Sequence, residues 1–291
     1  MSSAPWRSVL FVPAHVDRFV TSAVSSDADA IQLDLEDSVP LPDKDTARAA
    51  LSSAIQQLAA GGRDVLVRIN RELRAAVADL EAAVVVGVRA ISLPKTACAE
   101  HLKLIDELVT ELEIERGLPV QGIGLIAMVE TPEGLAQVEA MSRACSRVSA
   151  LTVGTEDFSA ACGMEPRPSN LFAPCQRLLF AARAAGISAY GFPGSIAEFT
   201  DLEGYRDQVL QGRAMGFEGA FCIHPAQVSV LNVAFEPDAD ALAEARATIA
   251  AWEEATEQGL GAVALHGRMI DLPVVQRARA LLARSRGKQE R

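Results

Sequence analysis

Eight short apolar segments alternate along the chain with stretches of helical periodicity, and this alternation restricts the fold more than any other feature. Successive segments begin roughly 25–35 residues apart, the size of one strand–helix unit of a parallel sheet. Their near-continuous apolar runs are typical of strands that are buried on both faces. The predicted strands cover residues 8–13, 30–37, 64–70, 89–95, 122–130, 149–154, 187–192 and 219–223.

Eight parallel strands are also the number that closes a barrel. We therefore predict an α/β protein with a (β/α)8 barrel, also called a TIM barrel. An open doubly wound sheet is the alternative, but no G-x-G-x-x-G turn follows the first predicted strand.

The composition of the chain fits a barrel and argues against several other kinds of protein. A length of 291 residues is comfortable for a barrel of about 250 residues. The net charge of -11 argues against a nucleic-acid partner. No apolar run approaches the ~18 residues of a membrane span, and the first residues lack a secretory signal pattern. Five scattered cysteines without C-x-x-C spacing suit reduced thiols, so we expect a cytoplasmic protein.

The chain continues well beyond the eighth predicted strand. We predict a barrel core over residues 1–225 and a C-terminal helical extension over residues 226–291, with helices at 238–259 and 272–284. Glycines in the segment between these two helices suit a loop that moves over a barrel mouth. The extension is expected to cover the active face or to pack on a neighbouring subunit.

Acidic residues follow three of the predicted strands. Glu130 ends the fifth strand, and Thr131 and Pro132 then suit the cap and first position of a helix. Asp157 follows the sixth strand, and Asp37 ends the second. The carboxyl ends of barrel strands carry the chemistry of such enzymes, and Mg²⁺ prefers oxygen ligands. The set therefore predicts a Mg²⁺ site, although each acid could instead cap the helix that follows it.

Eight short motifs occur in a fixed order over almost the full length of the chain. They lie at residues 10–13 (LFVP), 33–37 (LDLED), 68–70 (RIN), 93–95 (LPK), 129–131 (VET), 154–157 (GTED), 223–225 (IHP) and 269–271 (MID). With these motifs the chain resembles the citrate lyase beta-subunit-like proteins of the HpcH/HpaI aldolase superfamily. The resemblance implies a Mg²⁺-dependent barrel enzyme that cleaves or forms carbon–carbon bonds in 3-hydroxy acyl-CoA thioesters.

The resemblance also implies roles for individual residues. Glu130 and Asp157 would bind the metal directly, and Glu36 and Asp37 would hold water molecules that are bound to the metal. Arg68 would contact the reacting oxygens of the oxo acid, with Glu130 also facing the substrate. An ion pair with Glu36 or Asp37 is the alternative role for Arg68.

Asp271 resembles the C-terminal acid–base residue of the family, which is often delivered from a neighbouring subunit. Its alternative role is to cap the helix predicted to begin at Leu272. His224 is expected to be a structural hydrogen-bonding residue, and Lys95 to lie on the surface or face a phosphate.

The chain departs from the family pattern at segments that border the expected thioester entrance. Ala14, His15, Val16 and Asp17 replace the usual Gly-Asn-Arg-Pro after the first strand. The acyl carrier is therefore the part of the substrate that the motifs specify least.

The leading hypothesis is a Mg²⁺-dependent carbon–carbon lyase that converts a 3-hydroxy dicarboxylic acyl-CoA, such as malyl-, citramalyl- or citryl-CoA, into a short acyl-CoA and an oxo acid. A malyl-CoA-type thioesterase, an aldolase acting on free 4-hydroxy-2-oxo acids, and a non-catalytic subunit of a lyase complex are the alternatives. The expected partners are this small-molecule substrate and further copies of the chain, in a trimer or hexamer.

Overall fold

A computed structural model describes residues 5–286 and confirms the (β/α)8 barrel. Its parallel strands are β1 (Ser8–Pro13), β2 (Ala30–Asp34), β3 (Asp64–Arg68), β4 (Val88–Leu93), β5 (Gly124–Val129), β6 (Val148–Val153), β7 (Ser188–Tyr190) and β8 (Ala220–Cys222). Neighbours in the sequence are neighbours in the sheet from β1 to β7, and β8 pairs with β1. A bridge between Tyr190 and Gly219 joins β7 to the segment before β8. The N–H of Gly191 donates to the carbonyl of Gly219 at 2.9 Å and closes the ring there.

Side chains along each strand alternate between the barrel interior and the surrounding helices, as the pleat of a strand requires. In β2, Ala30 belongs to the interior cluster, whereas Ile31 and Leu33 belong to the outer core. The interior cluster is apolar and draws one side chain from each of the eight strands, together with Trp6: Val9, Ala30, Leu66, Ala90, Ile126, Ala150, Tyr190 and Phe221. The next inward position of β2 is Gln32, which accepts a hydrogen bond from the buried Ser92 hydroxyl.

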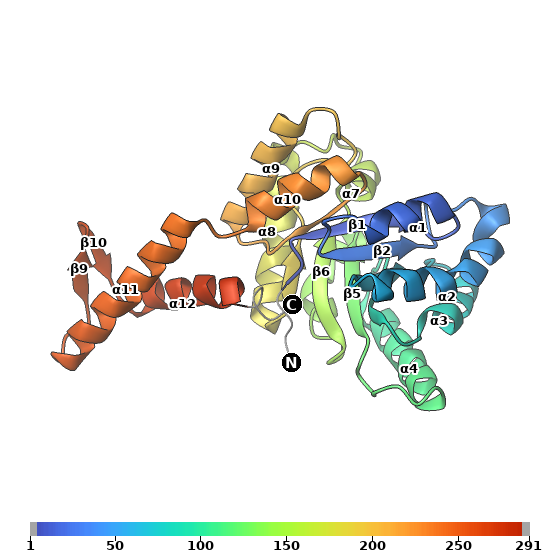
Figure 1. Cartoon of the computed structure of the whole chain (residues 1–291), viewed down its shortest axis with the longest axis horizontal. Helices are drawn as coiled ribbons and strands as arrows, with labels where there is room; N and C mark the ends of the chain where they lie inside the picture. The colour runs from blue at the N-terminus through green and yellow to red at the C-terminus, as the bar shows by residue number, and fades with distance from the viewer. Residues whose placement is uncertain (1–4, 287–291) are drawn as a thin grey trace. The chain divides into compact units, whose positions relative to one another are not determined.

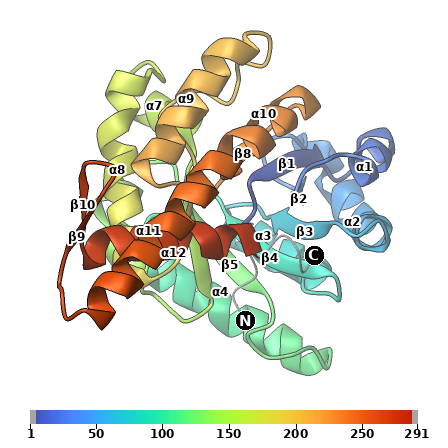
Figure 2. The same cartoon turned by 60° about the vertical axis from the view of Figure 1, so that its left-hand side comes forward.

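Helices cover the outside of the strands, as Figures 1 and 2 show for α1, α2 and α3. Helix α2 buries residues at helical spacing, including Ala47, Leu51, Ile55 and Leu58, because these lie on one face of the helix. The helices of this unit are α1 (Asp17–Val24), the 3-10 turn η1 (Leu41–Asp43), α2 (Lys44–Ala60), α3 (Leu73–Ala83), α4 (Ala99–Glu115), α5 (Pro132–Ala136), α6 (Val138–Met141), α7 (Thr155–Cys162), α8 (Pro168–Ala185), α9 (Leu202–Met215) and α10 (Pro225–Phe235).

The chain forms two compact units, of which the barrel unit spans Trp6–Phe235. Helix α10, which follows the predicted boundary at residue 225, packs on α9 and β1. The second unit, from Glu236 onward, contains α11 (Ala239–Glu257), an antiparallel hairpin of β9 (Val263–Leu265) and β10 (Arg268–Ile270), and α12 (Leu272–Arg286). Helices α11 and α12 pack on each other within this unit. Within residues 5–286 no helix is long and apolar enough to span a membrane.

Several predicted elements differ from those observed, and local chemistry explains the differences. The predicted strand 30–37 ends at Asp34, because this carboxylate accepts hydrogen bonds from the N–H groups of Glu36 and Ser38 and turns the chain. By contrast, the helix after the fifth predicted strand begins at Pro132 with Thr131 as its cap, as the sequence indicated. Helices α7 and α10 and the β9–β10 hairpin had not been predicted, since short elements carry little periodicity.

Candidate active site

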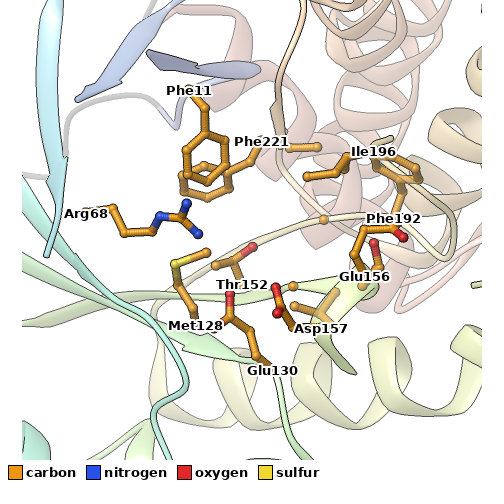
Figure 3. Close-up of a pocket in the computed structure, with 15 residues that line it drawn as sticks. Phe11, Arg68, Met128, Glu130, Thr152, Glu156, Asp157, Phe192, Ile196 and Phe221 are labelled. Atoms are coloured by element: carbon orange, nitrogen blue, oxygen red, sulfur yellow. The ribbon is translucent and has the colours of Figure 1, made fainter. Parts of the chain in front are cut away.

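Three of the predicted site residues lie together at the carboxyl ends of the barrel strands. Arg68 is the last residue of β3, Glu130 follows β5, and Asp157 lies in the first turn of α7, directly after β6. All three line one pocket. Figure 3 shows the guanidinium of Arg68 and the carboxylates of Glu130 and Asp157 facing the same space. The structure therefore brings together residues that are up to 89 positions apart, as the difference between 68 and 157 gives.

The alternation along the strands explains why these side chains point inward. Arg68 lies two residues after the interior Leu66, and Glu130 lies four residues after the interior Ile126. Asp34 occupies the same position in β2, four residues after Ala30. The polar groups thus continue the inner face of the barrel toward its open end.

Glu130 is buried and held from two sides. Glu130 is 1 % exposed, and its Oε2 accepts a hydrogen bond from the N–H of Lys95 at 2.6 Å. A Cβ atom added at Gly154 would lie 2.5–2.9 Å from atoms of the Glu130 side chain, so glycine is needed there. Burial raises the pKa of Glu130 to about 7, and the nearby charges of Glu36 and Asp157 act in the same direction.

Arg68 is the centre of a buried ion network. Its Nε and Nη2 atoms donate to the two oxygens of Asp34, each at 2.7 Å, and Nη1 lies 2.8 Å from Glu36 Oε2. The guanidinium also lies 4.7 Å from the ring centroid of Phe11. Burial is the largest single influence and acts to raise the pKa of Asp34, but the hydrogen bond and charge of Arg68, together with the hydrogen bonds from Ser38 and Glu36, outweigh it and hold that pKa below its usual value. The predicted alternative of an ion pair for Arg68 is confirmed, with Asp34 as its unforeseen main partner.

Glu36 belongs to this network and Asp37 lies at its edge, 3.8 Å from Arg68 Nη1, but neither residue lines the pocket. The ammonium of Lys95 binds the Glu36 carboxylate and lies 3.4 Å from Asp37 Oδ1. Burial raises the pKa of Glu36 despite the charge of Arg68. The sequence placed Lys95 on the surface or facing a phosphate, whereas the structure places it against two acids of the site. The predicted contact of Glu36 and Asp37 with metal-bound water stays a prediction.

Two carboxylates, from Glu130 and Asp157, are available to hold a metal in the pocket. The part of the chain that the structure describes contains no group of three or more His, Cys, Asp or Glu side chains arranged around a metal position. Mg²⁺ is commonly bound by one or two protein carboxylates, with water and substrate oxygens completing its octahedron. The donor set therefore fits Mg²⁺ and does not fit a structural zinc site.

The rest of the pocket is formed by α7 and by an apolar wall. The first turn of α7 contributes Thr155, whose hydroxyl is buried without a hydrogen-bond partner within residues 5–286, and Glu156, which accepts a hydrogen bond from the Ser195 hydroxyl. The apolar wall consists of Phe11, Met128, Phe192, Ile196 and Phe221. The sequence motifs did not indicate that these residues belong to the site. The two-residue alternation along β5 and β8 places Met128 and Phe221 on the inner face of the barrel, and this could have indicated them.

The remaining candidates, Asp271 and His224, are not among the residues that line this pocket. Asp271 precedes α12 in the C-terminal unit, and its Oδ1 accepts a hydrogen bond from the N–H of Val274 at 3.3 Å, so it does cap this helix. His224 accepts a hydrogen bond from the N–H of Ala226 and stacks on Phe199 at 4.9 Å between ring centroids. His224 is thus structural, as predicted.

A parallel barrel with acidic residues and a buried arginine at the carboxyl ends of its strands defines the chain as a (β/α)8 enzyme with a metal-compatible active site. The family model described as HpcH/HpaI aldolase/citrate lyase matches residues 7–225. The chain therefore belongs to the HpcH/HpaI aldolase/citrate lyase family. This match confirms the family and the carbon–carbon lyase class that the motifs had indicated.

Individual relatives resemble the chain over nearly its whole length. Citrate lyase subunit beta of Escherichia coli (strain K12) is 34% identical over 283 residues, which cover 96% of this chain and 93% of the relative. The (3S)-malyl-CoA thioesterase of Cereibacter sphaeroides (strain ATCC 17029 / ATH 2.4.9) is 34% identical over 284 residues, covering 97% and 95%. Among solved structures, protein CitE from Mycobacterium tuberculosis in complex with magnesium, acetoacetate and coenzyme A has a TM-score of 0.73 and 29% identity, covering 97% of this chain and 98% of that chain.

Proposed function

We propose that the protein is a Mg²⁺-dependent carbon–carbon lyase that cleaves or forms a 3-hydroxy acyl-CoA thioester such as malyl-, citramalyl- or citryl-CoA. The observation that carries the proposal is the convergence of Glu130, Asp157 and Arg68 in one pocket at the carboxyl ends of the strands. The family membership supports the reaction class, and the CitE relative in complex with magnesium and coenzyme A supports the cofactor and the carrier.

In this proposal Glu130 and Asp157 hold the metal. When bound, Mg²⁺ would supply Lewis-acid polarisation and orient the hydroxyl and carboxylate oxygens of the substrate. The Lys95 N–H keeps Glu130 in place, and Gly154 leaves room for its carboxylate. The Glu130 carboxylate is thereby positioned before the substrate arrives.

Arg68 would hold the oxo-acid half of the substrate. A guanidinium has five N–H donors. Asp34 receives two hydrogen bonds from it, through Nε and Nη2, and Nη1 lies 2.8 Å from Glu36 Oε2. The remaining donors can reach a substrate oxygen while the buried pair with Asp34 fixes the plane of the guanidinium. Burial is the largest single influence and acts to lower the pKa of Arg68, but the hydrogen bonds to Asp34 together with the charges of Asp34, Glu36 and Glu130 outweigh it, so Arg68 stays charged at any working pH.

The start of α7 would bind the substrate carboxylate. Helix N-termini attract anions through their free N–H groups and their dipole. The residues from Gly154 to Asp157 line the pocket, and the buried Thr155 hydroxyl has no other hydrogen-bond partner among the described residues. A carboxylate placed here would also lie beside the two metal-binding acids.

Asp271 would be the acid–base residue that exchanges a proton with the α-carbon of the departing thioester. We infer that it acts in a homo-oligomer, trimer or hexamer, in which the C-terminal unit of one chain reaches the barrel of another. Free cysteines at all five positions suit a reducing compartment, and we place the protein in the cytoplasm.

A thioesterase acting through the same site is the second candidate, because the malyl-CoA thioesterase relative is as similar to this chain as the citrate lyase subunit. Incubation with a panel of hydroxyacyl-CoA esters and mass spectrometry of the products would separate the two functions. A lyase releases a short acyl-CoA and an oxo acid, whereas a thioesterase releases free CoA and the hydroxy acid. Absence of any acyl-CoA product with every ester would contradict the proposed lyase.

A further inference from the structure

The turn that follows β2 is held by its backbone carbonyls as well as by its N–H groups. Asp34 accepts hydrogen bonds from the N–H groups of Glu36 and Ser38. The ammonium of Lys44 donates to the carbonyls of Leu35 and Glu36, each at 2.6 Å. Lys44 is the first residue of α2, so the helix that follows the turn supplies the group that holds its carbonyls.

Asn70 reaches the same turn from the segment after β3. Its side-chain amide donates to the Leu35 carbonyl at 2.9 Å and to Asp79 Oδ2 at 2.7 Å. The backbone N–H of Asn70 also donates to Asp79 Oδ2, and Arg48 Nε donates to the other oxygen of this carboxylate. Asp79 is a fully buried residue of α3, so Asn70 ties the turn to the packed layer of helices.

The held turn carries the two acids that bind Arg68. Asp34 accepts hydrogen bonds from Nε and Nη2 of the guanidinium, and Glu36 Oε2 lies 2.8 Å from Nη1. All three nitrogens are therefore oriented by one turn, and in this orientation the guanidinium faces the pocket (Figure 3). Because paired hydrogen bonds fix the plane of a guanidinium, a displacement of the turn would change the orientation of Arg68.

Lys44 can be removed without leaving the carbonyls of the turn unpaired. The Leu35 carbonyl would keep the hydrogen bond from Asn70, and the Glu36 carbonyl would keep the one from the N–H of Val39 at 3.0 Å. Each carbonyl would lose one of two hydrogen bonds, so the turn should persist with greater freedom. The orientation of the turn can thus be tested separately from its folding.

We propose that Lys44 is a positioning residue for the reaction: it fixes the turn after β2, whose two acids hold the Arg68 guanidinium toward the pocket. Lys44 does not line the pocket and acts through the turn and Arg68. The inference rests on the proposed function for what Arg68 binds. The positioning of the guanidinium does not depend on that function.

The first test is hydrogen exchange at two arginine Nε–H groups, followed by NMR on the full chain. The Nε–H of Arg68 reports on the turn. The Nε–H of Arg147, which donates to Asp106 at 2.7 Å from a fully buried side chain directly before β6, reports on the barrel as a whole. Lys44→Met should raise the Arg68 rate at least about tenfold relative to the Arg147 rate, whereas simple destabilisation of the barrel would raise both rates together. Lys103→Met, at an exposed position of α4, is the control and should change neither rate.

The second test is calorimetry on the same variants, with pyruvate as the probe oxo acid. Lys44→Met should weaken the binding of pyruvate at saturating Mg²⁺ at least about fivefold, because the guanidinium would spend less time in the orientation that binds it. The Mg²⁺ affinity should change by less than about twofold, since the hydrogen bonds of Lys44 involve neither Glu130 nor Asp157. Lys103→Met should match wild type in both measurements.

An unchanged ratio of the Arg68 and Arg147 exchange rates in Lys44→Met would overturn the inference. A fall of the pyruvate and Mg²⁺ affinities by the same factor would also overturn it, because Lys44 would then act on the whole site. Wild-type protein that binds no pyruvate would instead contradict the role that the proposed function gives to Arg68. The exchange rates would still decide whether Lys44 positions the guanidinium, so the two failures are distinguishable.

Discussion

The backbone N–H of Lys95 points at Glu130 Oε2, 2.6 Å away, from a residue whose φ of 47° lies in the left-handed region. A residue with a β-carbon adopts this conformation at a cost on the order of 1 kcal/mol, so the surrounding contacts must hold it there. The Lys95 side chain supplies one such contact through its ion pair with Glu36. The turn after β4 thus orients a carboxylate that follows β5.

This arrangement makes the metal-binding role of Glu130 testable without loss of the fold. Glu130→Gln keeps an acceptor for the Lys95 N–H and removes a buried charge, so the metal-free variant should be at least as stable as wild type. Mg²⁺ binding in calorimetric titration and activity should both be lost, and Asp157→Asn should lose them as well. Unchanged Mg²⁺ affinity in both variants would show that these acids serve another purpose.

Gly154 offers a second approach to the same carboxylate. Its φ of -86° suits any residue, but a Cβ atom would lie 2.5 Å from Glu130 Cγ and 2.6 Å from Oε1. Gly154→Ala should displace the Glu130 carboxylate, weaken Mg²⁺ binding at least tenfold, and reduce stability by about 1–3 kcal/mol. Gly261→Ala is the matched control, since a Cβ there meets nothing within 4 Å. Equal Mg²⁺ affinities for the two variants would argue against the crowding.

Arg68 should not tolerate lysine, because its fork binds both oxygens of Asp34. Arg68→Lys leaves a buried carboxylate incompletely paired, and we expect a loss of about 2 kcal/mol in the free energy of unfolding. Its turnover should fall almost as far as that of Arg68→Ala. Arg89→Lys, at an exposed position paired with Asp64, should change stability by less than about 0.5 kcal/mol. Near-normal turnover of Arg68→Lys would reduce Arg68 to a general positive charge.

The sequence predicted the barrel because eight apolar runs at a steady spacing allow few other folds. It predicted Glu130 and Asp157 because they follow those runs, whereas the role of Arg68 was implied by the family resemblance. It did not indicate Asp34 as the partner of Arg68, although the two-residue alternation within β2 and β3 places both side chains inward. The contact of the Lys95 N–H with Glu130 depends on a left-handed backbone in a Leu-Pro-Lys segment, which residue types alone do not specify. The apolar wall draws Ile196 from a loop whose path is set by the distant Gln227.

His101 makes the stability of the barrel unit sensitive to mild acid. Burial, and then the charge of Arg71, lower its pKa to about 4, whereas an unfolded histidine titrates near 6.5. Between these values the unfolded chain binds more protons, so the contribution of His101 to stability is lost as the pH falls from about 6.5 to about 4. As the pH falls through this range, the free energy of unfolding of His101→Gln should decrease by about 1–2 kcal/mol less than that of wild type, measured by urea unfolding. The exposed His224→Gln is the control, and parallel curves for His101→Gln and wild type would refute the prediction.

Asp271 carries the last prediction, which concerns cooperation between chains. In the structure it caps α12 through the N–H of Val274, and asparagine is an equally good cap. Asp271→Asn should therefore preserve the helix and the stability of the C-terminal unit while removing the acid–base group. If this helix-capping role were its only one, the variant would keep full activity.

The proposed action of Asp271 on a neighbouring barrel can be tested by complementation. An Asp271→Asn chain retains the metal-binding acids, and a Glu130→Gln chain retains the C-terminal aspartate, so each supplies what the other lacks. Random exchange of subunits at equal concentrations should create intact sites at about one quarter of positions, because a working site needs one partner of each kind. Two inactive proteins should therefore recover activity toward about a quarter of the wild-type rate. The rate is measured after mass spectrometry of tagged chains has verified subunit exchange. No recovery after proven exchange would mean that Asp271 acts on the barrel of its own chain, since a mixed oligomer would then contain no complete site.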